Sequence, residues 1–147
     1  MAKLIAHQIL AIGLSLYMLR PSSIGETFTI AFLALTASTI PDLDSKLDHR
    51  KLLHNLFAVL LTSLTIYIVL SAFSSPIAMN PIYHITSYII GYLSHIAVDM
   101  FTCNGVALLY PVSKKRYRVF GTSYDNPIYN GAIITLGSIL LYFYLTS

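Results

Sequence analysis

Residues 81–103 read PIYHITSYIIGYLSHIAVDMFTC, an apolar run of bilayer-spanning length. Pro81 stands at the first helical position, where proline is tolerated, and Asn80 before it can cap the helix. Polar or small residues recur on one face of this helix at spacings of three and four, namely His84, Tyr88, Gly91, His95, Asp99 and Thr102. Ionisable groups at membrane depth usually face the interior of a bundle. The stretch therefore predicts a membrane helix with one inward-facing polar stripe.

Four further apolar segments accompany this helix. They cover about residues 2–19, 24–40, 51–73 and 127–145. The first two are short for a hydrocarbon core of roughly 30 Å, so they either cross a locally thinned bilayer or form a tight hairpin that returns the chain to its starting side. The sequence predicts an all-α fold, a polytopic membrane helical bundle of about five transmembrane or re-entrant helices, in a single membrane-embedded domain over residues 1–147.

The composition favours lipid over water as the solvent. Hydrophobic residues make up 56% of the chain and charged residues only 10%, and the mean hydropathy is +0.70. Soluble domains carry about 25% charged residues, so a soluble all-helical domain with an unusually apolar core is the weaker alternative. The first segment lacks a small-residue cleavage site, and His7 and Gln8 interrupt its start, so it does not read as a signal peptide.

The basic residues predict the orientation of the chain. With the N-terminus in the cytoplasm, eight of the nine basic residues fall in cytoplasmic segments and only Arg20 falls outside. These eight are Lys3, Lys46, Arg50, Lys51, Lys114, Lys115, Arg116 and Arg118. The net charge of +3 is then an orientation signal, and no nucleic-acid partner is expected. The predicted location is the inner cell membrane, with several passes.

Signals for helix starts assign structural roles to several polar residues. Ser23 and Glu26 form a capping box, and Asn126 precedes a proline in the same way as Asn80. Asp48 can cap the third segment. Asp125 has no clear role, and the other acids left without a capping role are Asp42, Asp44 and Asp99.

The predicted orientation brings the remaining polar groups to one membrane face. His7 lies near the cytoplasmic start of the first helix, and the first inner loop contains Asp42 and Asp44. His49, Arg50 and His54 lie at the start of the third segment, where the i,i+4 spacing of Arg50 and His54 puts them on one helical face. His95 and Asp99 lie at the end of the fourth helix with the same spacing.

Imidazole and carboxylate ligands together suit zinc, and also manganese or iron(II). We therefore predict one or two divalent ions, with zinc as the favoured metal. The predicted ligands are His7, Asp42, Asp44, His54, His95 and Asp99. Each motif also has a simpler interpretation. His84 reads as an interior histidine, the Asp-x-Asp run suits a turn after proline, and His95 with Asp99 could form a mutual hydrogen bond. Cys103, four residues after Asp99, lies close enough to be a weaker ligand candidate.

Two further features bear on catalysis. Arg50 has a planar guanidinium that suits phosphate, so Arg50 and the neighbouring His49 are the candidate catalytic residues. On a helix these two side chains point in different directions, so both can face the site only if the third helix starts irregularly. The inner loop over residues 104–126 is long and basic, which fits a headgroup-level anchor or an attraction for anionic lipid headgroups.

These residues carry a family resemblance. Beyond His7, the shared pattern comprises IPDLD at residues 40–44, His-Arg followed by a second His over residues 49–54, GYLSHIAVDM at 91–100 and LLYP at 108–111. The chain resembles the YdjM-like family of inner-membrane, metal-dependent hydrolases, which is also described as LexA-binding. The family usually reads His-Arg-Gly-x-x-His-Ser, and here Lys51 and Asn55 replace the Gly and the Ser.

The resemblance implies hydrolysis by metal-activated water. The family is distantly similar to zinc-dependent phospholipase C, which implies a phosphoester substrate, and its location implies a lipid or lipid-linked one with an anionic headgroup. Membrane lipids are the expected partners, and the LexA-binding description implies a cytoplasmic protein partner. The alternative function is a metal-binding transport, sensor or scaffold protein without hydrolytic activity. Polar residues clustered at one helix end favour hydrolysis over transport, which needs them along the whole path.

Overall fold

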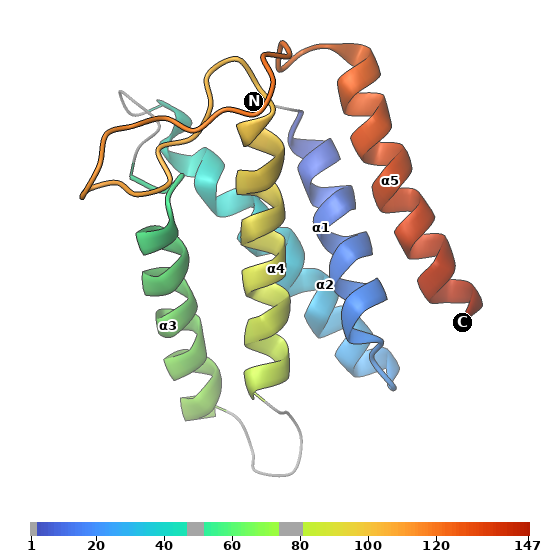
Figure 1. Ribbon diagram of the computed structural model, residues 1–147. Helices are drawn as coiled ribbons and strands as arrows, with labels where there is room; N and C mark the ends of the chain where they lie inside the picture. Colours follow the sequence, from blue (N-terminus) through green and yellow to red (C-terminus); the bar gives the residue numbers. More distant parts are fainter. Residues whose placement is uncertain (1–2, 47–51, 74–80) are drawn as a thin grey trace.

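The computed structural model describes residues 3–46, 52–73 and 81–147, which form helices joined by loops (Figure 1). The helices are α1 (Leu4–Leu19), α2 (Ile24–Thr39), the 3-10 helix η1 (Ile40–Lys46), α3 (Leu56–Phe73), α4 (Pro81–Met100) and α5 (Pro127–Thr146). Within these described ranges the chain contains no strand, only two isolated bridges in one loop. The predicted all-α class is confirmed.

The predicted caps of α2 and α5 are present. The Ser23 hydroxyl accepts a hydrogen bond from the Glu26 amide at 3.2 Å, and the Glu26 carboxylate in turn accepts from the Ser22 amide at 3.0 Å. The Asn126 side chain accepts from the amides of Ile128 and Tyr129. These bonds satisfy backbone donors that the first turn of a helix leaves unpaired. The predicted caps Asn80 and Asp48 lie outside the described residues.

The third helix starts later than the predicted residue 51. Its first helical residue is Leu56, and Asn55 caps it by accepting a hydrogen bond from the Ala58 amide at 2.8 Å. His54 therefore lies ahead of the helix, so the helical i,i+4 relation expected between Arg50 and His54 is wrong. An asparagine side chain competes well for backbone donors at a helix start, which explains why the apolar run before Asn55 stays non-helical.

Helix α1 lies at the centre of the arrangement and packs against α2, α4 and α5, while α3 packs against α4 (Figure 1). Two of these contacts depend on glycine. A Cβ on Gly13 would lie 2.2 Å from the carbonyl oxygen of Gly137, and a Cβ on Gly91 would lie 2.5 Å from that of Ala34. Glycine at these positions lets α1 approach α5, and α2 approach α4, at backbone distance.

The outer surface of the bundle is apolar. Side chains such as Phe28, Leu60, Leu61 and Ile128 are more than half exposed, a pattern that suits a lipid environment better than water. Two helical stretches, Ile24–Leu43 and Pro127–Thr146, are long and apolar enough to cross a membrane. The shorter stretches Leu4–Leu19 and Leu56–Ala72 are also apolar, and the number of spans stays a prediction.

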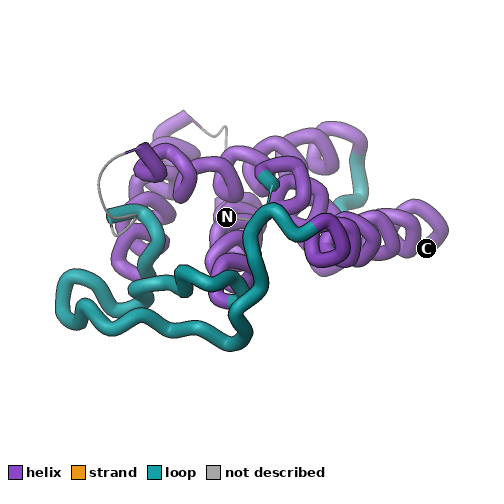
Figure 2. The backbone as a smooth tube through the Cα atoms, turned by 90° about the horizontal axis from the view of Figure 1, so that it is seen from above, coloured by secondary structure: helices purple, strands orange, loops and turns teal. Residues whose placement is uncertain are grey.

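The loop between α4 and α5 extends across one end of the bundle (Figure 2). It is ordered by backbone hydrogen bonds, including a reciprocal pair between Val106 and Tyr117 at 2.9 and 2.8 Å. The carbonyl of Leu108 accepts a hydrogen bond from the Leu56 amide at 3.0 Å, which ties the loop to the start of α3. The loop therefore covers the end of the bundle at which His7 of α1 and His95 and Asp99 of α4 lie.

Candidate metal centre

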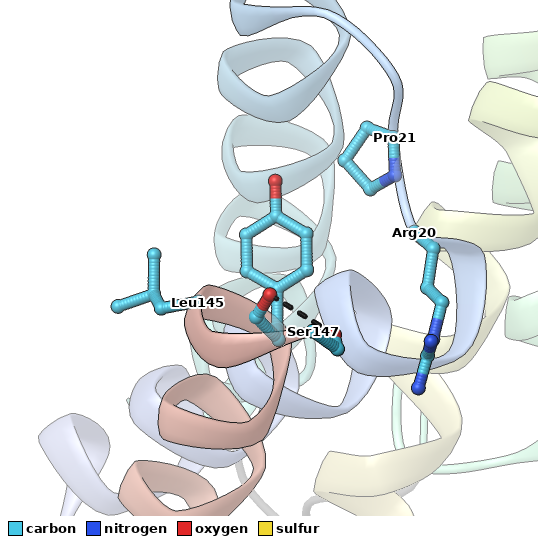
Figure 3. A pocket seen from close by; sticks show the side chains of 5 residues that line it. Arg20, Pro21, Leu145 and Ser147 are labelled. Carbon is cyan, nitrogen blue, oxygen red and sulfur yellow. Dashed lines mark hydrogen bonds between the residues drawn. The ribbon is translucent and has the colours of Figure 1, made fainter.

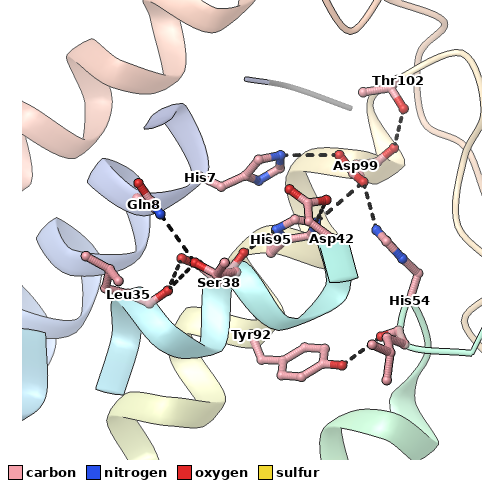
Figure 4. Close-up of polar contacts among 12 residues, drawn as sticks. His7, Gln8, Leu35, Ser38, Asp42, His54, Tyr92, His95, Asp99 and Thr102 are labelled. Atoms are coloured by element: carbon pink, nitrogen blue, oxygen red, sulfur yellow. Dashed lines mark hydrogen bonds and ion pairs between the residues drawn. The ribbon is translucent and has the colours of Figure 1, made fainter. Parts of the chain in front are cut away.

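Five of the predicted ligands come together at this end of the bundle (Figure 4). His7 comes from the first turns of α1 and Asp42 from η1. His54 comes from the segment before α3, and His95 and Asp99 come from adjacent turns of α4. Four segments that are far apart in sequence thus deliver three imidazoles and two carboxylates to one point.

The spacing of these groups matches that of ligands around one ion. Asp99 lies at the centre, with His7 Nε2 at 3.4 Å from its Oδ1 and His54 Nε2 at 3.3 Å from its Oδ2. His95 Nε2 lies 3.6 Å from Asp99 Oδ2 and 3.5 Å from Asp42 Oδ1. Zinc-ligand bonds of about 2.0–2.2 Å in a tetrahedron place neighbouring ligand atoms roughly 3.3–3.6 Å apart. The distances also exceed the 2.7–2.9 Å, approximately, of a charge-assisted hydrogen bond.

The centre is buried, and several of its polar atoms lack hydrogen bonds. His7 and His95 are fully buried, and Asp99 is 5% exposed. Within the described part of the chain, His7 Nε2, His95 Nε2, Asp42 Oδ1 and Asp99 Oδ1 have no hydrogen-bond partner. Buried polar atoms are rarely left in this state, because each costs about 1–3 kcal/mol. The donor set therefore fits a divalent cation, which would pair with all four atoms.

A backbone contact fixes the orientation of the His95 ring. Its Nδ1 lies 2.7 Å from the carbonyl oxygen of Ser38. A carbonyl can only accept, so Nδ1 carries the proton, and in the neutral ring Nε2 presents its lone pair to the centre. Outer contacts of this kind usually fix the tautomer of a metal-binding histidine. The sequence gives no sign of this contact, because any residue at position 38 supplies the same carbonyl.

The five side chains form two overlapping groups that could each hold an ion. One comprises His7, His95 and Asp99, and the other comprises Asp42, His54 and His95; within each group the ligand atoms lie within 4.8 Å of one another. Both groups use His95. The two oxygens of Asp99 face different imidazoles, so the five side chains would suit either one ion or two.

Contacts outside the cluster hold the segment that bears His54. The Tyr92 hydroxyl donates to the carbonyl of Leu53 at 2.8 Å, and the Asn55 side-chain amide donates to the carbonyl of Leu52 at 2.8 Å. These bonds fix the non-helical residues 52–55 that precede α3. His54 therefore reaches Asp99 from the opposite side to His7.

The remaining predicted residues have different outcomes. Asp44 lies in η1, and its side chain is outside the described residues, as are His49 and Arg50 entirely. His84 is buried in α4 and belongs to neither metal-binding group, in agreement with its interpretation as an interior histidine. Cys103 is exposed, and its thiol donates to the carbonyl of Gly121 at 2.7 Å. It lies beyond the end of α4 and outside the cluster.

A pocket at the opposite end of the bundle carries no comparable chemistry. It is lined by Arg20, Pro21, Tyr144, Leu145 and Ser147, where the ends of α1 and α5 meet (Figure 3). The Ser147 hydroxyl donates to the carbonyl of Tyr144 there. Among the described residues, this pocket contains no imidazole or side-chain carboxylate. The His/Asp cluster is therefore the candidate site.

A bundle of apolar helices with a buried His/Asp cluster at one end defines a membrane protein with a candidate metal centre. The chain belongs to the YdjM inner membrane protein family, whose family model matches residues 1–146. This match confirms the family predicted from the motifs. No curated protein and no solved structure matches the chain.

Proposed function

We propose that this protein is a multi-pass inner-membrane hydrolase that cleaves a lipid or lipid-linked phosphoester at the cytoplasmic face. One observation carries the proposal, namely the convergence of five donor side chains from four segments at ligand spacing. Nitrogen and oxygen donors suit zinc, with manganese and iron(II) as alternatives. One or two ions fit the donor set.

A bound divalent ion supplies a Lewis acid that lowers the pKa of a coordinated water molecule toward neutrality. The residues of the chain provide the setting for this chemistry. Asp99 offers two oxygens to imidazoles on opposite sides, and Ser38 holds the His95 ring in place. Burial of the cluster keeps bulk water away and so strengthens the attraction between the carboxylates and a cation.

Stabilisation of the phosphoryl charge needs a cation near the centre. We assign this role to Arg50, with His49 as a further catalytic candidate, on the chemistry of their side chains and their place beside His54 in the sequence. The basic loop contributes at longer range. Arg116 and Arg118 each donate to a loop carbonyl, of Asn104 and Cys103 respectively, and these contacts hold two guanidinium groups at the same end of the bundle as the cluster.

The test combines metal content with activity. Purified wild-type protein is expected to carry about one or two zinc equivalents, and the double variant His95→Ala with Asp99→Ala to carry almost none, because it lacks His95, which both groups share, and Asp99, which contacts three imidazoles. Metal content is read by inductively coupled plasma mass spectrometry. The metal-loaded protein is then assayed against a panel of phospholipids and lipid-linked phosphates. Equal metal in both proteins contradicts the metal centre, and bound metal without any hydrolysis contradicts the enzyme.

The second outcome would favour a metal transporter, sensor or scaffold, and one observation supports that alternative. The polar stripe of α4 continues from the cluster through Tyr88 to His84, and both side chains are buried. A transport path needs such groups at membrane depth. Zinc uptake into proteoliposomes that is lost in His84→Ala would identify transport, whereas uptake equal to that of protein-free vesicles would exclude it.

A further inference from the structure

A groove runs along the bundle beside the metal centre. Helices α4 and α5 both pack against α1, but their own backbones stay apart and are linked through side chains such as Tyr129, so part of the surface of α1 is left open between them. The groove has a volume of about 370 Å³. Leu10 and Leu14 of α1 form its floor, and the residues along its walls are Ser94, Ala97, Val98 and Phe101 of α4 and Tyr129, Ile133 and Leu136 of α5.

The lining of the groove is apolar. Its two hydroxyl groups are both engaged by backbone carbonyls, since Ser94 donates to Gly91 at 2.8 Å and Tyr129 donates to Val98 at 2.6 Å. A cavity of this kind offers water nothing to bind and favours a hydrocarbon occupant. Ala97 and Leu136 are exposed, so the groove is open along its side. In an inner membrane protein that side faces acyl chains.

The groove is built in part from the same two helices, α1 and α4, that carry three of the donor residues, although none of the donors lines it. Leu10 and Leu14 follow His7 on α1 by three and seven residues, which places them on the same helical face in successive turns. On α4, Val98 directly precedes Asp99. The Tyr129 hydroxyl closes the groove at the carbonyl of Val98, one residue from the carboxylate that contacts the three imidazoles.

We propose that this groove binds one acyl chain of a membrane phospholipid and so presents the headgroup of that lipid to the His/Asp cluster. The proposal rests on the proposed function and names the substrate class of the site: a diacyl lipid with an anionic phosphate headgroup. Charge supports this occupant. Lys3 is exposed at the start of α1, four residues before His7, and the basic loop lies at the same end of the bundle.

Photocrosslinking tests the acyl-chain site directly. The full-length protein is reconstituted into phosphatidylethanolamine vesicles that contain phosphatidylglycerol with a diazirine on one acyl chain. After irradiation, labelled peptides are mapped by mass spectrometry. We expect labelling of groove residues such as Leu14, Ala97 and Leu136 to exceed that of the outer face of α3, at Leu61 and Leu64, because a bound chain stays in place longer than bulk lipid.

Matched tryptophan variants separate the groove from general lipid contact. Ala97→Trp fills the groove and is expected to lower groove labelling about tenfold, since the indole takes the space of several methylenes. Ala132→Trp makes the same change on α5 at an exposed position outside the lining and is expected to leave labelling unchanged. Leu136→Trp fills the groove from the opposite wall and supports the result if Ala97→Trp folds poorly.

The outcomes are distinct from those of the hydrolysis test, because neither labelling nor metal content requires turnover. Labelling equal on the groove and on α3, or unaffected by both groove-filling variants, overturns the acyl-chain site. Cross-links between two copies of the chain through Ala97→Cys would overturn it in favour of a protein occupant. Groove labelling in a protein that hydrolyses no lipid would keep the acyl-chain site and reject the enzyme.

Discussion

At the scale of single residues, the two carboxylates of the centre have unequal roles. Asp99 lies within 4 Å of three imidazoles, those of His7, His54 and His95, whereas among the described residues Asp42 lies that close to one, His95. Asp99 is also the more deeply buried of the two, because only 6% of its side chain is exposed against 14% for Asp42. The donor set is therefore organised around Asp99.

This difference predicts which of two isosteric variants, Asp99→Asn or Asp42→Asn, loses more zinc affinity. Asp99→Asn should weaken zinc binding more than the roughly 10- to 100-fold that loss of an outer partner costs, because it removes the central charged ligand. Asp42→Asn should weaken binding less than Asp99→Asn. Competition with a chromophoric zinc chelator measures both affinities.

The control for these variants is Asp125→Asn. Asp125 is an exposed carboxylate that accepts a hydrogen bond from the Ser123 hydroxyl, and this bond holds the pKa of the Asp125 carboxyl below its usual value. Its neutralisation should leave zinc affinity unchanged. An Asp42→Asn variant that loses more affinity than Asp99→Asn would contradict the central position of Asp99.

At the scale of elements, α4 contributes more to the candidate metal centre than any other helix. Its polar stripe supplies His95 and Asp99, and Gly91, one turn before His95, sets how closely α4 approaches α2. The carbonyl that orients His95 belongs to Ser38 of α2. Close packing of α2 and α4 is therefore a condition for the geometry of the metal centre.

We predict that Gly91→Ala destabilises the protein by about 1–3 kcal/mol, because its Cβ would meet the backbone of Ala34 and force the helices apart. Zinc affinity should fall as well, since the Ser38 carbonyl moves away from His95. Thermal unfolding in detergent, with and without zinc, measures both effects.

Gly131→Ala is the matched control on α5. A Cβ at Gly131 meets nothing within 4 Å, and alanine has the higher helix propensity by about 1 kcal/mol. This variant should melt at the same temperature or a higher one and bind zinc normally. If the two variants behaved alike, the close contact of α2 with α4 would not explain the effect.

Element positions were predictable where local signals and apolar length agree. The starts of α2 and α5 follow from Ser23 and Asn126, and both helices begin where these caps predict. The start of α3 was predicted about five residues too early, because the apolar residues before Asn55 read as helix. Their non-helical path depends on the Asn55 cap and on two tertiary contacts, of Leu53 with Tyr92 and of Leu56 with the loop carbonyl of Leu108, and no local pattern reveals the tertiary contacts.

The candidate site was predictable to a similar degree. Convergence of His7, Asp42, His54, His95 and Asp99 followed from topology, because the charge bias brings their segments to one face. The central position of Asp99 among these residues could not be predicted, because it depends on the angle at which α1 and the segment before α3 reach α4. The groove beside the cluster was also beyond prediction, since it arises from the separation of α4 and α5.

At the scale of the whole molecule, the apolar surface and the basic loop predict one orientation in the bilayer. Cys103, the single cysteine, is exposed at the end that bears the cluster. A membrane-impermeant maleimide should label it in inverted membrane vesicles and not in intact spheroplasts, if the basic residues keep the loop in the cytoplasm as predicted.

A second cysteine position tests the other face. Ser22→Cys in a Cys103→Ser background places the thiol between α1 and α2, beside Arg20, and should be labelled from the periplasmic side. Labelling of both positions from the same side would reject the predicted topology. Labelling of Cys103 in spheroplasts alone would invert it.

The separation of the donors along the chain has a consequence for biogenesis. The cluster joins residue 7 to residue 99. The donor set is therefore incomplete until α4 has been synthesised and inserted. His7 is therefore synthesised long before Asp99, the residue that it contacts. Helix α5 carries none of the five donors and follows last, against a helix that the centre already ties to α4. Any metal binding by the full donor set therefore requires α1, η1, the segment before α3 and α4 to be in place together.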